Sequence, residues 1–199
     1  SAILGYANDE LNEYVNSIIK NGVNCTLNSI EEVLLAEKLL ELNPFAGGVK
    51  FARTGGEAMA IAVRIARTYS GKTKVLFSGY HGWTDWYLAA NISSSKALNN
   101  HLIPGLEPRG VPPGLQGTAI PFNYDDSENF EKVFSENKDC GIICIEGARN
   151  DYPNNEFLEK IMNVAKKYNI IIISDEITSG WRVTDGGVYK INGFKPDIV

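Results

Sequence analysis

The stretch YNIIIISDEITSGWR, residues 168–182, places four consecutive isoleucines directly before Ser174, Asp175 and Glu176. An unbroken apolar run of this length is typical of a strand covered on both faces, as in parallel sheets. Ligands bind at the carboxyl ends of strands in open α/β sheets, so the polar residues at this exit are candidates for a site. A carboxylate held there can pair with a protonated heterocyclic nitrogen. The alternative is a helix cap or a structural salt bridge, the commoner use of such a group.

Other apolar runs predict the rest of a sheet. TKVLFSG at residues 73–79 and GIICIEG at 141–147 are also continuous, and a shorter strand is predicted at 49–52. A capping box predicts a helix over 30–42, and apolar residues at helical spacing predict another over 157–168. Because strands and helices alternate, the expected fold is α/β: a three-layer α/β/α sandwich with a mainly parallel sheet.

The sequence TGGE predicts a helix that begins directly after the strand at 49–52. Thr54 and Glu57 form a second capping box around Gly55 and Gly56. The first amide groups of a helix have no partner within it, and they lie at the positive end of the helix dipole. This pattern favours a phosphate site, although an ordinary tight turn between strand and helix would have the same sequence.

A glycine-bounded loop, GYHGW, follows the strand at 73–79. Its aromatic residues Tyr80, His81 and Trp83 are suited to covering a flat ring, and the alternative is aromatic packing at the surface. The chain has two histidines. Neither has a cysteine or acidic partner at ligand spacing, so no metal site is expected.

Composition limits the class of protein. The 199 residues are 44% hydrophobic and 22% charged, with a formal net charge of -5, which indicates a single soluble domain. Without a basic patch, no nucleic-acid or membrane partner is expected. The sequence lacks a signal peptide and an apolar run long enough to span a bilayer, so a cytoplasmic location is expected. Cys25, Cys140 and Cys144 form no CxxC pair and are expected to be reduced, with buried thiols.

Two further segments need an interpretation. Residues 91–117 carry four prolines and four glycines, and loops of this length in compact domains are usually functional or disordered. SGKT at 70–73 ends like a phosphate-binding P-loop, but it precedes a strand instead of following one. We interpret it as a helix C-cap and turn.

Four stretches in this order resemble the class III aminotransferases, and within them the branch similar to glutamate-1-semialdehyde 2,1-aminomutase. They are FARTGGEAMAIAVRIAR, KVLFSGYHGW, IICIEGARND and IIISDEITSGWR, with GFKPDIV following, and they span most of residues 51–199. The resemblance implies the large domain of a fold-type-I, pyridoxal 5'-phosphate-dependent transferase. It also implies amino-group transfer between a small-molecule amino donor and a carbonyl acceptor, or within one molecule as in an aminomutase, and a homodimer.

The resemblance also assigns site residues. It implies that Thr54, Gly55 and Gly56 hold the cofactor phosphate, while Tyr80 stacks on the ring and His81 lies beside it. Asp175 would bond the ring nitrogen and Ile177 would pack on the opposite ring face. Asp175 and Glu146 are the catalytic candidates, although the resemblance assigns no role to Glu146.

The chain departs from the family pattern in three places. Gly56 stands where the family usually has a hydroxyl residue, so backbone donors would bind more of the phosphate, and Gly147 replaces a usual proline. The family's cofactor-binding lysine lies beyond the PDIV stretch, and Lys190 and Lys195 do not match it. The expectation is therefore that residues 1–199 are a single domain, most of the large domain of a longer enzyme, with its N-terminal segment and small C-terminal domain absent. Alone, such a fragment would be inactive.

Two alternatives remain at this point. A non-catalytic protein of the same fold, acting as a binding or assembly partner, would also lack the lysine. A binder of another phosphorylated ligand, such as a nucleotide sugar, would explain the glycines at the helix start but not Tyr80 or Asp175.

Overall fold

The computed structural model describes residues 3–24 and 26–199, so the expectation of a reduced, buried Cys25 lies outside the described residues. The chain divides into two compact units, residues 1–49 and 50–199. The expectation that residues 1–199 form one domain stays a prediction. No helix in the described part of the chain has the length and apolar character needed to cross a bilayer.

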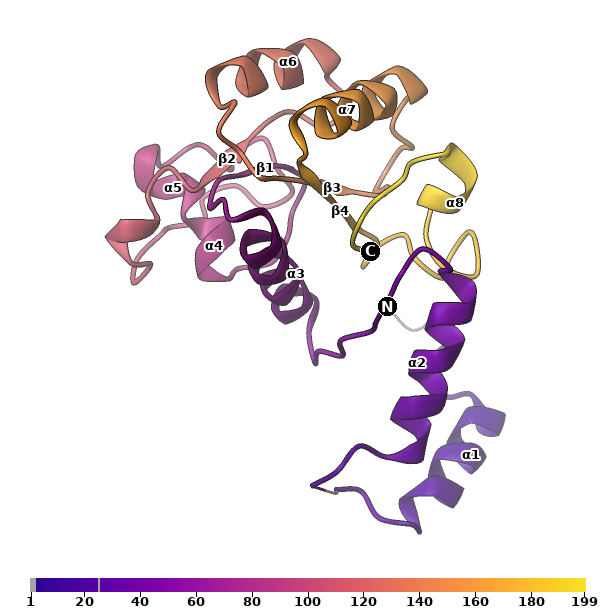
Figure 1. Ribbon diagram of the computed structural model, residues 1–199. Coiled ribbons are helices and arrows are strands. Elements are labelled where there is room, and N and C mark those ends of the chain that lie inside the picture. The colour runs from indigo at the N-terminus through magenta and orange to yellow at the C-terminus, as the bar shows by residue number, and fades with distance from the viewer. Residues whose placement is uncertain (1–2, 25) are drawn as a thin grey trace. The chain divides into compact units, whose positions relative to one another are not determined.

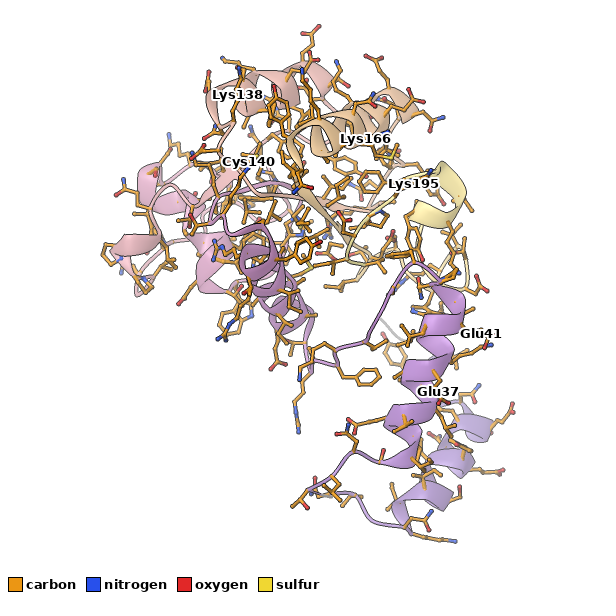
Figure 2. All side chains as sticks on the ribbon, in the orientation of Figure 1. Glu37, Glu41, Lys138, Cys140, Lys166 and Lys195 are labelled. Atoms are coloured by element: carbon orange, nitrogen blue, oxygen red, sulfur yellow. The ribbon has the colours of Figure 1, made fainter. Side chains whose placement is uncertain are left out.

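The first unit contains two helices, α1 (Asp9–Ile19) and α2 (Ile30–Leu42). α2 has the predicted bounds because its capping box forms. Ser29 Oγ accepts the Glu32 N–H at 3.3 Å, and Glu32 Oε2 accepts the Ser29 N–H at 3.2 Å. Figure 2 shows the exposed side chains of Glu37 and Glu41 along α2.

The second unit is built on a four-stranded, fully parallel sheet in the order β2-β1-β3-β4. Its helices lie on both faces, so the predicted α/β/α sandwich is confirmed (Figure 1). Its elements are α3 (Gly55–Ser70), β1 (Val75–Ser78), α4 (Asp85–Leu88), α5 (Ala90–Ser93), η1 (Pro113–Leu115), β2 (Ala119–Pro121), α6 (Ser127–Glu136), β3 (Ile142–Glu146), α7 (Asn155–Tyr168), β4 (Ile171–Asp175) and α8 (Tyr189–Asn192).

Neighbouring residues of each strand belong to different cores. Phe77 of β1 packs with the α3 and α4 side chains, whereas Leu76 packs with those of α6 and α7. β1 and β3 are fully buried, and β4 is buried from Ile172 onwards. This two-sided burial is the physical reason for continuous apolar strands. The register places Glu146 of β3 beside Asp175 of β4, so two strand exits meet at one edge.

Three smaller predictions concern the buried cysteines, the SGKT turn and the segment 49–52. Cys140 and Cys144 are buried and free, as predicted; Figure 2 labels Cys140 below α6. Gly71 caps α3 with φ at 66°, which confirms the C-cap interpretation of SGKT. The strand predicted at 49–52 was wrong. Residues 50–52 are exposed and pair with no strand, so the short apolar run lacks the burial that a strand needs.

Candidate active site

The start of α3 carries backbone amides in an arrangement that suits an anion. Thr54 Oγ1 caps the helix by accepting the Glu57 N–H at 3.2 Å. In the expected capping box, the Glu57 side chain would accept the Thr54 N–H. In the structure, Glu57 Oε2 accepts the N–H of the preceding residue, Arg53, at 2.7 Å. The amides of Gly55 and Gly56 donate to no group in the described part of the chain. They therefore leave two donors at the positive end of a 16-residue helix.

The loop after β1 lies directly against this helix start. Gly82 has φ at 95°, and a Cβ atom built on it would lie 2.8 Å from Gly56 Cα. Only glycine at position 82 allows this approach, because a side chain would both strain the backbone and meet backbone atoms. The contact places Tyr80 of the same loop beside the glycines of α3, and these residues line one pocket.

Asp175 ends β4 as a buried carboxylate with two partners. Its side chain is 4% exposed; Oδ1 accepts the Ile177 N–H at 3.0 Å, and Oδ2 lies 2.8 Å from His81 Nδ1. His81 is also buried, and its Nε2 lies 3.2 Å from the Ser78 carbonyl oxygen. A carbonyl only accepts, so Nε2 carries a proton, and an ionised Asp175 requires a proton on Nδ1 as well. The geometry therefore describes an imidazolium–carboxylate pair.

The protonation of His81 agrees with this geometry. Complete burial alone would lower the pKa of His81, but its contacts with Cys144 and Asp175 outweigh burial and raise that pKa well above its usual value. Burial raises the pKa of Cys144, whose Sγ lies 3.6 Å from His81 Nε2. Asp175 is thus oriented by a buried cation.

Glu146 ends β3 beside Asp175 and is also buried. Its Oε2 accepts the Tyr80 N–H at 3.3 Å and the Arg149 Nε–H at 3.1 Å, while Arg149 Nη2 donates to Oε1. The Glu146 carboxylate raises the pKa of Arg149, so this guanidinium is charged. Gly79 makes room for Glu146, because a Cβ atom there would lie 2.5 Å from Glu146 Cγ.

The start of α3, the loop after β1 and the ends of β3 and β4 line an open pocket of about 330 Å³ at the carboxyl edge of the sheet. Of the eight predicted site residues, only Thr54 does not line it, because its hydroxyl caps α3. The residues around the pocket suit an α/β protein that holds a phosphorylated, ring-bearing ligand. Its lining residues are Gly55, Gly56, Tyr80, His81, Gly82, Trp83, Leu102, Glu146, Arg149, Asp175, Ile177 and Thr178.

The second carboxylate of the opening stretch has a structural role. Glu176 accepts hydrogen bonds from the hydroxyls of Ser174 and Ser179 and from the amides of Val188 and Tyr189. It therefore ties the end of β4 to the turn before α8. Asp175 therefore lines the pocket, whereas Glu176 has the structural role.

The proline-rich loop at 91–117 is anchored to the exit of β1 through His101. Asn91 Nδ2 donates to the Leu106 carbonyl at 2.5 Å, and His101 Nδ1 accepts the Gly79 N–H at 3.2 Å. Leu102 follows and lines the pocket. The length of this loop indicated a functional or a disordered segment, and no sequence pattern pointed to His101 as the anchor.

The anchor predicts a pH dependence of stability. Burial, with the nearby charge of His81, lowers the pKa of His101 to about 4, below the usual 6.5. At a pH between these two pKa values, His101 is protonated in the unfolded chain and neutral in the folded protein. The free energy of unfolding therefore falls as pH drops from 6.5 towards 4, by up to about 3 kcal/mol. His101→Asn keeps an acceptor for Gly79 and should lose this part of the pH dependence in urea unfolding. An unchanged slope in the variant would contradict the role of His101.

Comparisons with known proteins agree with this fold. A sequence model of the family described as "Aminotransferase class-III" matches residues 1–199. The chain therefore belongs to the class-III aminotransferases, and the resemblance drawn from its motifs is confirmed. The chain is 34% identical to the 3-aminobutyryl-CoA aminotransferase of Cloacimonas acidaminovorans, over 98% of this chain and 45% of that protein. It is also 34% identical to the glutamate-1-semialdehyde 2,1-aminomutase of Francisella philomiragia, over 98% of this chain and 46% of that protein.

Solved structures show the same fold. An omega-transaminase from Sphaerobacter thermophilus superposes with a TM-score of 0.81 at 24% identity, over 96% of this chain and 45% of that one. A glutamate-1-semialdehyde aminomutase from Pseudomonas aeruginosa PAO1 gives 0.75 at 18% identity, over 98% and 43%. The fold-type-I expectation is thus confirmed. The chain spans about half the length of the curated relatives it matches.

Proposed function

We propose that the protein containing this chain transfers amino groups with pyridoxal 5'-phosphate as cofactor. One observation supports this proposal most strongly: the amides of Gly55 and Gly56, the aromatic Tyr80 and the buried carboxylate of Asp175 converge on one pocket. Family membership supports the same reaction class. Both an aminotransferase and an aminomutase fit these observations.

The residues present fit the cofactor. The unpaired amides at the start of α3 suit the cofactor phosphate. Gly56 has no side chain, and if a Cβ atom were built on it, the nearest side-chain atom would be Thr84 Cγ2, at 3.6 Å. Tyr80 and Ile177 would flank the ring. Asp175, fixed by the His81 imidazolium and the Ile177 amide, would hold a proton on the ring nitrogen. When bound, pyridoxal phosphate supplies an electron sink for bonds broken next to the substrate nitrogen.

The remaining parts of this proposal concern partners and location. The substrates are a small-molecule amino donor and a carbonyl acceptor, and the protein is a cytoplasmic homodimer that binds neither nucleic acid nor membrane. Its family and its acidic net charge of -5 support these statements. Sedimentation of the purified protein at several concentrations tests the homodimer, and a monomer at all concentrations would contradict it.

The reaction is tested by an absorbance titration of the complete protein, expressed from its gene, with pyridoxal phosphate. We expect a saturable change in visible absorbance that borohydride fixes covalently to one lysine. Adding an amino donor should change the spectrum, and adding a carbonyl acceptor should restore it. A protein that gives no saturable change would not be a pyridoxal-phosphate enzyme.

A further inference from the structure

We propose that the hydroxyl of Thr84 binds the cofactor phosphate beside the amides of Gly55 and Gly56. This inference deepens the proposed function, on which it rests, by adding a phosphate-binding residue from the loop after β1. It starts from the donors at the start of α3. A phosphate has three strongly accepting oxygens, whereas the two glycines offer one amide each and no side-chain donor. The site therefore has a use for a further donor.

Thr84 carries a buried hydroxyl that the described part of the chain does not use. The residue is the N-cap of α4, but its side chain makes no capping hydrogen bond. Its Oγ1 is buried and has no hydrogen-bond partner among the described residues. Buried polar groups are normally paired, because burial removes their water partners at a cost in free energy. An unpaired hydroxyl beside a binding pocket is the expected state of a group whose partner is a ligand.

Thr84 lies against the first turn of α3. A Cβ atom built on Gly56 would lie 3.6 Å from Thr84 Cγ2 and 3.8 Å from Gly82 Cα. The loop is in backbone contact with the helix start at Gly82, and Thr84 follows two residues later. The Thr84 side chain therefore borders the space that opens above Gly56, where a phosphate bound to the glycine amides would lie.

In the structure the methyl group of Thr84, rather than its hydroxyl, faces this space. No Thr84 atom other than Cγ2 lies within 4 Å of the Cβ position at Gly56. A rotation of about 120° about χ1 leads to another staggered rotamer and moves Oγ1 into the place of Cγ2. The rotation breaks no hydrogen bond, because Oγ1 has no partner among the described residues. A phosphate oxygen that accepts a hydrogen bond from Oγ1 stabilises the rotated side chain.

The test compares Thr84→Val with a matched control, Thr68→Val, in the complete protein. Valine keeps the shape of threonine and removes the hydroxyl. Thr68 is an exposed residue of α3 whose hydroxyl donates to the Arg64 carbonyl, and it lies outside the pocket. Binding of pyridoxal phosphate is followed by absorbance, and pyridoxal, which lacks the phosphate, is the second ligand.

Thr84→Val should weaken the binding of pyridoxal phosphate by about 10- to 100-fold, the effect of losing one hydrogen bond to a charged group. It should leave the affinity for pyridoxal unchanged, and Thr68→Val should leave both affinities unchanged. Equal affinity of wild type and Thr84→Val for pyridoxal phosphate would overturn the inference. Equal losses for pyridoxal phosphate and pyridoxal would overturn it as well, because they would indicate a purely structural role.

A second substitution tests the position of the hydroxyl. Gly56→Ser supplies a hydroxyl from the other side of the same space, and the Cβ contacts of 3.6 and 3.8 Å leave room for it. In the Thr84→Val background, Gly56→Ser should restore most of the lost affinity for pyridoxal phosphate. A double variant that binds as weakly as Thr84→Val would contradict the proposed place of the Thr84 hydroxyl.

Inorganic phosphate separates this inference from the proposed function. A complete protein that binds no pyridoxal phosphate would refute the proposed function. Phosphorus NMR titration with inorganic phosphate would then still test Thr84, and we expect Thr84→Val to bind phosphate about tenfold or more weakly than wild type. Equal phosphate affinities, or no binding to wild type at about 100 mM, would overturn the inference.

Discussion

Asp175→Asn should lower the turnover of the complete, cofactor-loaded protein by about 10²- to 10³-fold or more. The substitution keeps the size of the side chain but removes the buried negative charge beside His81 and the ring nitrogen. Removing one preorganised electrostatic contact from an active site lowers turnover by about 10²- to 10³-fold, which corresponds to about 3–4 kcal/mol in the activation barrier. Without the carboxylate, the ring nitrogen of a bound cofactor would not be held protonated, and the cofactor would supply a weaker electron sink. Steady-state kinetics with one donor–acceptor pair measures the effect.

A surface aspartate provides the control for this substitution. Asp139→Asn removes a carboxylate that pairs with Lys74 at 2.7 Å and is 71% exposed. It should leave turnover unchanged, because surface ion pairs contribute little. The far-ultraviolet circular dichroism of both variants should match wild type. A folded Asp175→Asn variant with wild-type turnover would show that Asp175 does not act on the cofactor.

Gly82→Ala should destabilise the protein by about 2–5 kcal/mol and abolish cofactor binding. A non-glycine residue at φ of 95° costs about 1–2 kcal/mol. The new Cβ atom would also lie 2.8 Å from Gly56 Cα, and overpacking of this kind costs about 1–3 kcal/mol. Relieving the contact moves the Tyr80 loop away from the start of α3, so the two sides of the pocket separate. Urea unfolding and a pyridoxal phosphate titration measure the two effects.

Gly110→Ala separates backbone strain from the close contact. Gly110 has φ at 86°, but a Cβ atom there meets no atom within 4 Å. This variant should lose only the strain contribution of about 1–2 kcal/mol and should bind the cofactor normally. Equal losses of stability in Gly82→Ala and Gly110→Ala would contradict the claim that the approach of Gly82 to Gly56 builds the pocket.

The strands and helices that could be predicted from the sequence are those with a strong local pattern. The continuous apolar runs of β1, β3 and β4 and the capping box of α2 predicted their positions correctly. β2 was missed because it has three residues and ends at a proline. The apolar run at 49–52 looks like a strand but has no partner, and strand formation depends on neighbours that a local pattern does not contain.

The candidate site was predictable at its strand exits and not in its internal contacts. Parallel strands bring their carboxyl ends to one edge, so the glycines of α3, Tyr80 and Asp175 could be expected to meet. The pairing of His81 with Asp175 spans 94 residues, and sequence spacing carries no information about it. The division of roles between Asp175 and Glu176 likewise depends on which side of the strand end each carboxylate faces.

A crystal structure of the complete protein, grown with pyridoxal phosphate, would locate the cofactor directly. We predict the phosphate at the amides of Gly55 and Gly56, the ring beside Tyr80, and the ring nitrogen within hydrogen-bond distance of an Asp175 carboxylate oxygen. A cofactor bound elsewhere, or one whose ring nitrogen faces away from Asp175, would contradict the account.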